Sequence, residues 1–250
     1  MRRGWTALFA ATVLVGAAII ALVAVWHVQP RGFGIWDLSI GTVTTSAVLL
    51  VFAWLASRVW NTPIRVERVR SVGRAIASVT WLASASVTID SVTTLLGYAS
   101  PSERTIGMLH SASLPSFVVT AIAIAILPAL SEEALFRGAI APFVERESGA
   151  AISFVTTSVL FGALHLSPRQ SVQAAVLGFV LHAISRREGL SVAILAHAAN
   201  NLAFACFARA SVAQEPASAF IVGSLVFGGA TFVVLRKPFP RAPVFAPPNG

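Results

Sequence analysis

The stretch from Pro115 to Ala141, PSFVVTAIAIAILPALSEEALFRGAIA, decides the fold because it places charged side chains inside a long apolar run. A transmembrane helix needs about 20 mostly apolar residues, at a rise of roughly 1.5 Å each. This stretch is long enough, and lipid allows such a run only as a helix that satisfies its own backbone polar groups. The sequence therefore predicts a membrane span that carries Glu132, Glu133 and Arg137.

The composition of the whole chain also indicates that the protein lies in a lipid bilayer. Of its 250 residues 56% are hydrophobic and 11% are charged, whereas soluble domains carry about 25% charged residues. Most of the surface is therefore expected to face lipid. The net charge of +8 comes from basic residues in short loops between apolar runs, a pattern of membrane topology and not of nucleic-acid binding. The only cysteine, Cys206, excludes an internal disulfide and a cysteine-based zinc site.

Eight segments are long and apolar enough, or nearly so, to cross a membrane. None shows the alternating pattern of a membrane barrel, so the predicted fold class is all-α, a polytopic membrane helix bundle of about eight transmembrane helices with a polar site inside. The fifth and sixth segments are short, so the sequence leaves open whether one of them is re-entrant and does not cross the membrane. The eight segments are residues 5–28, 37–57, 75–98, 115–141, 150–166, 170–185, 190–208 and 217–235.

The two ends of the chain have distinct patterns. Arg2 and Arg3 precede an apolar run that is too long for a signal peptide and has no clear small-x-small cleavage site just after a short core, so an uncleaved helix is expected. We predict one transmembrane domain over residues 1–235, with the motif-bearing core at 115–210. The Pro-rich residues 236–250 are expected to form a disordered cytoplasmic tail.

The loop charges predict a multi-pass protein of the cell membrane with both termini in the cytoplasm. With that orientation, thirteen Lys and Arg lie inside and four lie outside. The inside set is Arg2, Arg3, Arg58, Arg65, Arg68, Arg70, Arg74, Arg146, Arg186, Arg187, Arg236, Lys237 and Arg241, and the outside set is Arg31, Arg104, Arg169 and Arg209.

The two adjacent glutamates are expected to have different roles. Neighbouring residues on a helix point about 100° apart, so Glu132 and Glu133 cannot share one partner. Glu133 and Arg137 have the i, i+4 spacing of an ion pair, which neutralises both charges within lipid. Glu132 is then left without a cation, and an unpaired carboxylate in apolar surroundings suits a general base or a proton relay.

Histidines at comparable positions complete a candidate site. Glu132 lies 16 residues before Ser148 and His165 lies 17 after it, so in an antiparallel hairpin both are about 24–26 Å from the turn. His197 and Asn201 share a helix face and suit either an oxyanion cradle or interhelical hydrogen bonds, with Asn200 close to that face. His197 is only about 12 Å from its own loop, so the 142–148 turn must project from the membrane.

These motifs, E-E-x-x-x-R, F-x-x-x-H and H-x-x-x-N in this order, resemble those of the CPBP family, the type II CAAX prenyl endopeptidases and bacteriocin-processing enzymes. The resemblance covers about residues 115–210 and implies a glutamate-dependent intramembrane endopeptidase. It implies that Glu132 and His165 activate a water, that His197 and Asn201 stabilise the oxyanion, and that Glu133 and Arg137 support the helix. The family is traditionally described as metalloproteases, so zinc on Glu132, His165 and His197 is left open.

The chain departs from the family pattern at one place. A Gly-x-x-x-Gly-type segment and a Thr-Gly-Ser-Leu-like turn are usual between the second and third motifs. Here Gly178 is followed four residues later by His182 in place of a second glycine, and the turn reads R-R-E-G-L-S. The larger His182 is expected to alter packing or the cavity, and therefore the substrate class. The expected partners are membrane lipid and a peptide or protein substrate, whose identity and prenylation the sequence leaves open, with no nucleic acid.

Two other classes of function stay open from the sequence. One is a non-catalytic membrane scaffold or immunity-type protein with the same polar core. The other is a proton-coupled transporter that uses Glu132 and Asp90, although recognisable repeats are absent. Asp90 has no obvious cation and is expected to bond hydroxyls such as those of Ser91 and Thr93, or to face the cavity. H-E-x-x-H, G-x-S-G and G-x-G-D motifs do not occur.

Overall fold

The computed structural model describes residues 2–28, 34–98, 103–210 and 216–235. Within these ranges the chain is helical and contains no strand, so the predicted all-α polytopic bundle is confirmed. The predicted tail at 236–250 lies outside the described residues. The helices are α1 (Arg2–Val28), α2 (Ile35–Val59), α3 (Val72–Leu95), α4 (Glu103–Ser111), α5 (Leu114–Glu133), the π-helix η1 (Ala134–Ile140), α6 (Ala141–Ser148), α7 (Ala150–Ala163), α8 (Pro168–Glu188), α9 (Leu190–Ala210) and α10 (Pro216–Leu235).

Helices occupy all eight predicted positions, but not all of them are long and apolar enough to cross a membrane. Five helical stretches meet that criterion by length and composition: α1, α2, α3, α9 and the continuous rod Leu114–Ser148. Helices α7 and α10 are apolar but shorter. Helix α8 carries several charged residues, including Arg186 and Arg187 in its last turn. The short helix α4 was not predicted.

The rod Leu114–Ser148 corrects the expected turn at 142–148. α5, η1 and α6 follow one another without interruption, and the chain reverses at Gly149. Gly149 has φ of 90°, a left-handed conformation that glycine adopts without a steric penalty. Residues 142–148 therefore form the end of a helix and not a turn. Helix α6 packs along α7 after the reversal, which places the glutamates of α5 and the histidine after α7 in one bundle.

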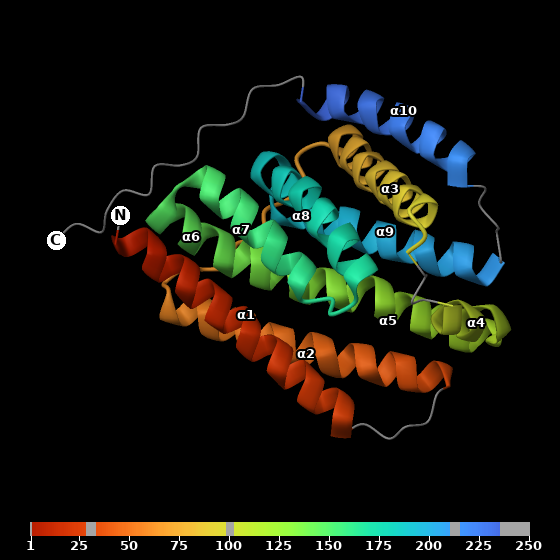
Figure 1. The fold of residues 1–250 in the computed structure, drawn as a ribbon, viewed down its shortest axis with the longest axis horizontal. Coiled ribbons are helices and arrows are strands. Elements are labelled where there is room, and N and C mark those ends of the chain that lie inside the picture. Colours follow the sequence, from red (N-terminus) through yellow and green to blue (C-terminus); the bar gives the residue numbers. More distant parts are fainter. Residues whose placement is uncertain (1, 29–33, 99–102, 211–215, 236–250) are drawn as a thin grey trace.

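Hydrogen bonds tie the helix ends together at two opposite ends of the bundle. At one end, on the left of Figure 1, Ser148 Oγ donates to the Gly4 carbonyl and the Arg146 guanidinium donates to the Trp60 carbonyl. The Arg187 side chain donates to the Val234 carbonyl at this end as well. At the other end, His110 Nδ1 donates to the Arg209 carbonyl. We call the first the basic end.

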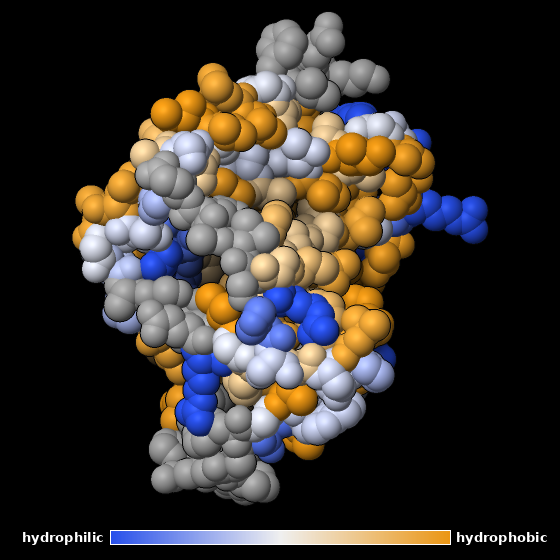
Figure 2. Space-filling model, turned by 90° about the vertical axis from the view of Figure 1, so that its right-hand side faces the viewer, coloured by the Kyte–Doolittle hydropathy of each residue, from blue (hydrophilic) through white to orange (hydrophobic). Residues whose placement is uncertain are grey.

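The outer faces of the helices are apolar. Large hydrophobic side chains such as Val43, Ile122 and Val155 are about half exposed along these faces, as expected where lipid is the solvent. Figure 2 looks onto the end opposite the basic end. Hydrophilic residues lie near the middle of that face and at parts of its edges, and hydrophobic residues are most frequent along its upper and right-hand margins. This distribution is that of a membrane protein.

Described arginines in the loops and near the helix ends are unevenly divided between the two ends of the bundle. The basic end carries Arg58, Arg65, Arg68, Arg70, Arg74, Arg146, Arg186 and Arg187, and the opposite end carries Arg104, Arg169 and Arg209. The expected orientation therefore corresponds to a basic end in the cytoplasm.

Reporter fusions test this orientation. A fusion at Gly250 and one near Arg68 should both report a cytoplasmic location, and one near Ser102 should report the outside, because the arginine-rich loops stay in the cytoplasm. An outside signal from Gly250 would contradict the orientation and mean that one predicted span does not cross.

Asp90 has a cation that the sequence analysis did not find. Arg169 Nη2 lies 2.7 Å from Asp90 Oδ1, and Gln173 Nε2 donates to the same oxygen at 2.9 Å. The expected bonds from the hydroxyls of Ser91 or Thr93 to this carboxylate do not form, since Thr93 and Thr94 donate to the Asp90 backbone carbonyl and Ser91 to that of Val87. The carboxylate joins α3 to the first turn of α8, so a structural bond explains Asp90 without a transport role.

Candidate active site

Glu133 and Arg137 form the expected ion pair at the junction of α5 and η1. Arg137 Nη1 lies 2.9 Å from Glu133 Oε1, and both side chains are buried. Arg137 Nη2 also donates to the Gly178 carbonyl on α8, and the guanidinium stands 4.5 Å from the centre of the Phe161 ring on α7. Arg137 therefore fixes the positions of α7 and α8 relative to Glu133.

His197 is held by the same carboxylate, a contact that the sequence analysis missed. Its Nδ1 lies 3.0 Å from Glu133 Oε1, and an ionised carboxylate only accepts hydrogen bonds, so Nδ1 carries the proton. Glu133 thus accepts hydrogen bonds from both Arg137 and His197. This fixes the imidazole so that its other nitrogen, Nε2, lies 3.8 Å from Glu132 Oε2.

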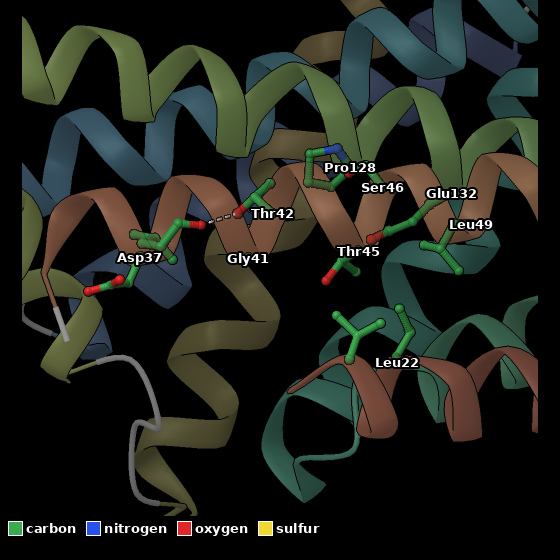
Figure 3. A pocket seen from close by; sticks show the side chains of 11 residues that line it. Leu22, Asp37, Gly41, Thr42, Thr45, Ser46, Leu49, Pro128 and Glu132 are labelled. Atoms are coloured by element: carbon green, nitrogen blue, oxygen red, sulfur yellow. Dashed lines mark hydrogen bonds between the residues drawn. The ribbon is translucent and has the colours of Figure 1, made fainter. Parts of the chain in front are cut away.

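Glu132 is the unpaired carboxylate that the sequence predicted. Its Oε2 is buried and has no hydrogen-bond partner among the described residues. The side chain lines a cavity of about 230 Å³ between α1, α2 and α5 (Figure 3). A buried oxygen without a donor is costly unless a ligand or water satisfies it. Glu132 is therefore placed to accept a proton from a molecule in this cavity.

His165 lies just after the end of α7 and is partly buried. Its Nδ1 donates to the Phe161 carbonyl at 3.0 Å, which leaves Nε2 as the unprotonated nitrogen of the neutral ring. The Phe161 ring makes edge contacts with both histidine rings, at centroid distances of 5.3 Å to His165 and 5.9 Å to His197. His165 and Glu132 are both described by the structure and make no hydrogen bond to each other, so their expected cooperation stays a prediction.

Asn200 and Asn201 follow His197 on α9, and both are partly buried. Asn201 is four residues after His197 and four before the buried Ala205, so it lies on the buried stripe of the helix. Neither asparagine side chain hydrogen-bonds to another described residue. The amide of Asn201 is thus available to a bound molecule beside His197.

His182 packs helices together and does not line the cavity at Glu132. Its Nδ1 lies 2.9 Å from Thr157 Oγ1, and the ring makes an edge contact with Phe154. The neighbouring Gly178 allows a close approach of α8 to α7, because a Cβ there would lie 3.1 Å from Ser158 Cα. Of the two expected effects of His182, the structure shows an effect on packing.

The zinc candidates do not form a ligand set. Glu132 and His197 approach each other, but His165 bonds to a backbone carbonyl of its own segment. Among the described residues no group of three or more His, Cys, Asp or Glu is placed to hold a metal ion. These donors therefore do not fit a three-ligand zinc site in this arrangement.

Comparison with known proteins bears on the motif-bearing core. Residues 114–203 match the family model for Type II CAAX prenyl endopeptidase Rce1-like. Over these residues the chain is similar to the Rce1-like family, in agreement with the resemblance that the motifs predicted. The match supports an intramembrane CAAX endopeptidase at the level of the family, with a peptide or protein substrate in a membrane. No curated protein and no solved structure matches the chain.

Replacement of Glu133 by Gln is expected to lower the melting temperature in detergent more than Glu132→Gln does. Removing the Glu133 charge leaves the buried Arg137 without its anion, and breaking a buried pair costs about 3–5 kcal/mol. Glu132 Oε2 makes no hydrogen bond whose loss would destabilise the fold. Glu133→Gln with Arg137→Met should recover part of the loss. Equal melting of the two single variants would contradict these roles.

Proposed function

We propose that the chain is an intramembrane endopeptidase that hydrolyses a peptide bond with water activated by Glu132. One observation carries this proposal: the buried, unpaired Glu132 Oε2 lines a cavity and lies 3.8 Å from His197 Nε2. A general base must be within reach of the proton that it takes and must not be neutralised by a cation. Glu132 meets both conditions, whereas Glu133 is occupied by Arg137 and His197.

The reaction follows from these positions. Glu132 takes one proton of a water while the water oxygen attacks the scissile carbonyl carbon. The resulting oxyanion is stabilised by the Asn201 amide of α9. A part for His197, whose Nδ1–H is held by Glu133, rests on the family resemblance. Glu132 then gives its proton to the leaving nitrogen as the carbon–nitrogen bond breaks. His165 takes part in activating the water, a role that rests on the family resemblance.

Glu133, Arg137 and Phe161 position the reacting groups in this proposal. Glu133 holds His197 by its Nδ1–H, and Arg137 holds Glu133. The Phe161 ring makes edge contacts with both histidine rings. The arrangement is largely formed before substrate binds, which is what electrostatic stabilisation of a transition state requires.

A digestion in heavy-oxygen water tests the proposal. The purified protein in detergent is incubated with a peptide library in H₂¹⁸O, and mass spectrometry detects new carboxyl termini that carry ¹⁸O. We expect such products from the wild-type protein and none from Glu132→Ala. The alternative of a non-catalytic scaffold or immunity-type protein predicts that both samples give the same background.

A further inference from the structure

The hydroxyl groups of α2 differ in what they bond. Hydroxyl side chains in helices usually donate to a carbonyl of the preceding turn. Thr42 and Thr44 do so, with oxygen–oxygen distances of 2.8 Å to the carbonyls of Leu38 and Ile40. Thr45 and Ser46 line the cavity between α2 and α5. Their hydroxyl groups make no hydrogen bond to another described residue, and Ser46 Oγ is buried.

Two buried oxygens without partners thus line one cavity. They are Glu132 Oε2 on α5 and Ser46 Oγ on α2. In Figure 3 the Glu132 side chain extends from α5 toward α2, where Thr45 and Ser46 lie. Buried polar groups in native proteins have partners, from the protein or from ordered water. The cavity of about 230 Å³ has room for several water molecules, at roughly 30 Å³ each.

The cavity also extends toward one end of the bundle. Its lining includes Asp37, in the first turn of α2, as well as Glu132. Asp37 lies nine positions before Ser46, which is about 13 Å along a helix. Thr45 and Ser46 lie along this length, within a lining that is otherwise mostly apolar, with side chains such as those of Leu22, Leu38 and Leu49. The polar groups give water hydrogen-bond partners at the Asp37 end and at the Glu132 end of the cavity.

We propose that Thr45 and Ser46 hold the reacting water against Glu132, and that water reaches this site along α2 from the Asp37 end. One O–H of the water donates to Glu132 Oε2 and the other to Ser46 Oγ, which leaves an oxygen lone pair free for attack. The proton of the first O–H passes to Glu132 as the oxygen bonds to carbon. Ser46 is then a positioning residue, and this kinetic role rests on the proposed function.

Thiol labelling in membranes tests the water cavity without any need for activity. Single cysteines replace Thr45 or Val43 in a Cys206→Ser background and are exposed to a membrane-impermeant methanethiosulfonate ammonium reagent. Val43 is the matched control because it is 50% exposed but lies on the outer face of the same helix. We expect labelling of Thr45→Cys at least about tenfold faster than of Val43→Cys. Equal rates would overturn the proposal.

Kinetics test the role of Ser46. Ser46→Ala should lower kcat about tenfold with KM and melting temperature nearly unchanged, and Ser46→Thr should restore most of the rate because it keeps a hydroxyl. Thr44→Val is the control, since Thr44 bonds only to its own helix. A kcat within twofold of wild type for Ser46→Ala, or a loss explained by lower stability, would overturn the positioning role. Labelling without proteolysis by the wild-type protein would instead refute the proposed function and leave the water cavity standing.

Discussion

Glu132→Gln is expected to lower the rate of peptide-bond hydrolysis by at least ~10²-fold while the protein still folds in detergent. Glutamine has nearly the shape of glutamate but cannot accept the proton of the attacking water. The fold should tolerate the change, because Glu132 Oε2 makes no hydrogen bond to another described residue and the side chain borders a cavity. The loss should therefore appear in kcat and not in the folded fraction.

Initial rates on a cleaved peptide, together with melting curves, measure this effect. Glu147→Gln is a suitable control, because Glu147 pairs with Arg146 near the surface of the basic end. It removes one carboxylate from the same rod of helix without touching the cavity. Activity of Glu132→Gln within a few-fold of wild type would refute Glu132 as the base.

The helices were predictable because a long apolar run in lipid can satisfy its backbone N–H and C=O groups in few ways other than a helix. The length and composition of residues 115–141 were enough to predict a helix there. The short helix α4 (Glu103–Ser111) was not found, since it is neither long nor apolar. The π-helix Ala134–Ile140 was not found either, because a local widening of the helix follows from packing and leaves no periodic signal.

Contacts within one helix were easier to predict than contacts between helices. The Glu133–Arg137 pair follows from i, i+4 spacing and is present. The bond from His197 to Glu133 joins residues 64 positions apart, and it depends on how α9 is rotated against α5. The spacing along α9 predicts that His197 and Asn201 share one face of the helix. It does not predict which residue of α5 this face contacts.

The error at Asp90 has the same origin. Its neighbours in the sequence are apolar, so it was expected to lack a cation. Arg169 was assigned to the loop before α8 by charge counting, but it lies within the first turns of that helix and reaches Asp90 on α3. A long arginine side chain can bring its charge to a partner several ångströms deeper than its backbone. Loop assignments therefore understate the cations available to carboxylates within apolar helices.

Asn201→Ala is expected to lower turnover by roughly 10²–10³ with little change in substrate affinity. The Asn201 amide makes no hydrogen bond to another described residue, so it is free to donate to the oxyanion that forms as water attacks. That charge exists in the transition state and not in the bound substrate, so the change should fall on kcat. Full kinetic curves for both proteins separate kcat from KM.

Asn200→Ala is the matched control, because adjacent side chains on α9 point about 100° apart. It removes the same amide from the same turn, and we expect turnover close to that of the wild type. If Asn201 served only to hold helices together, its loss would lower stability by about 1 kcal/mol, and activity would follow the folded fraction. Melting curves distinguish the two cases. Comparable losses of turnover at both positions would mean that the substrate does not meet the face of α9 that His197 and Asn201 share.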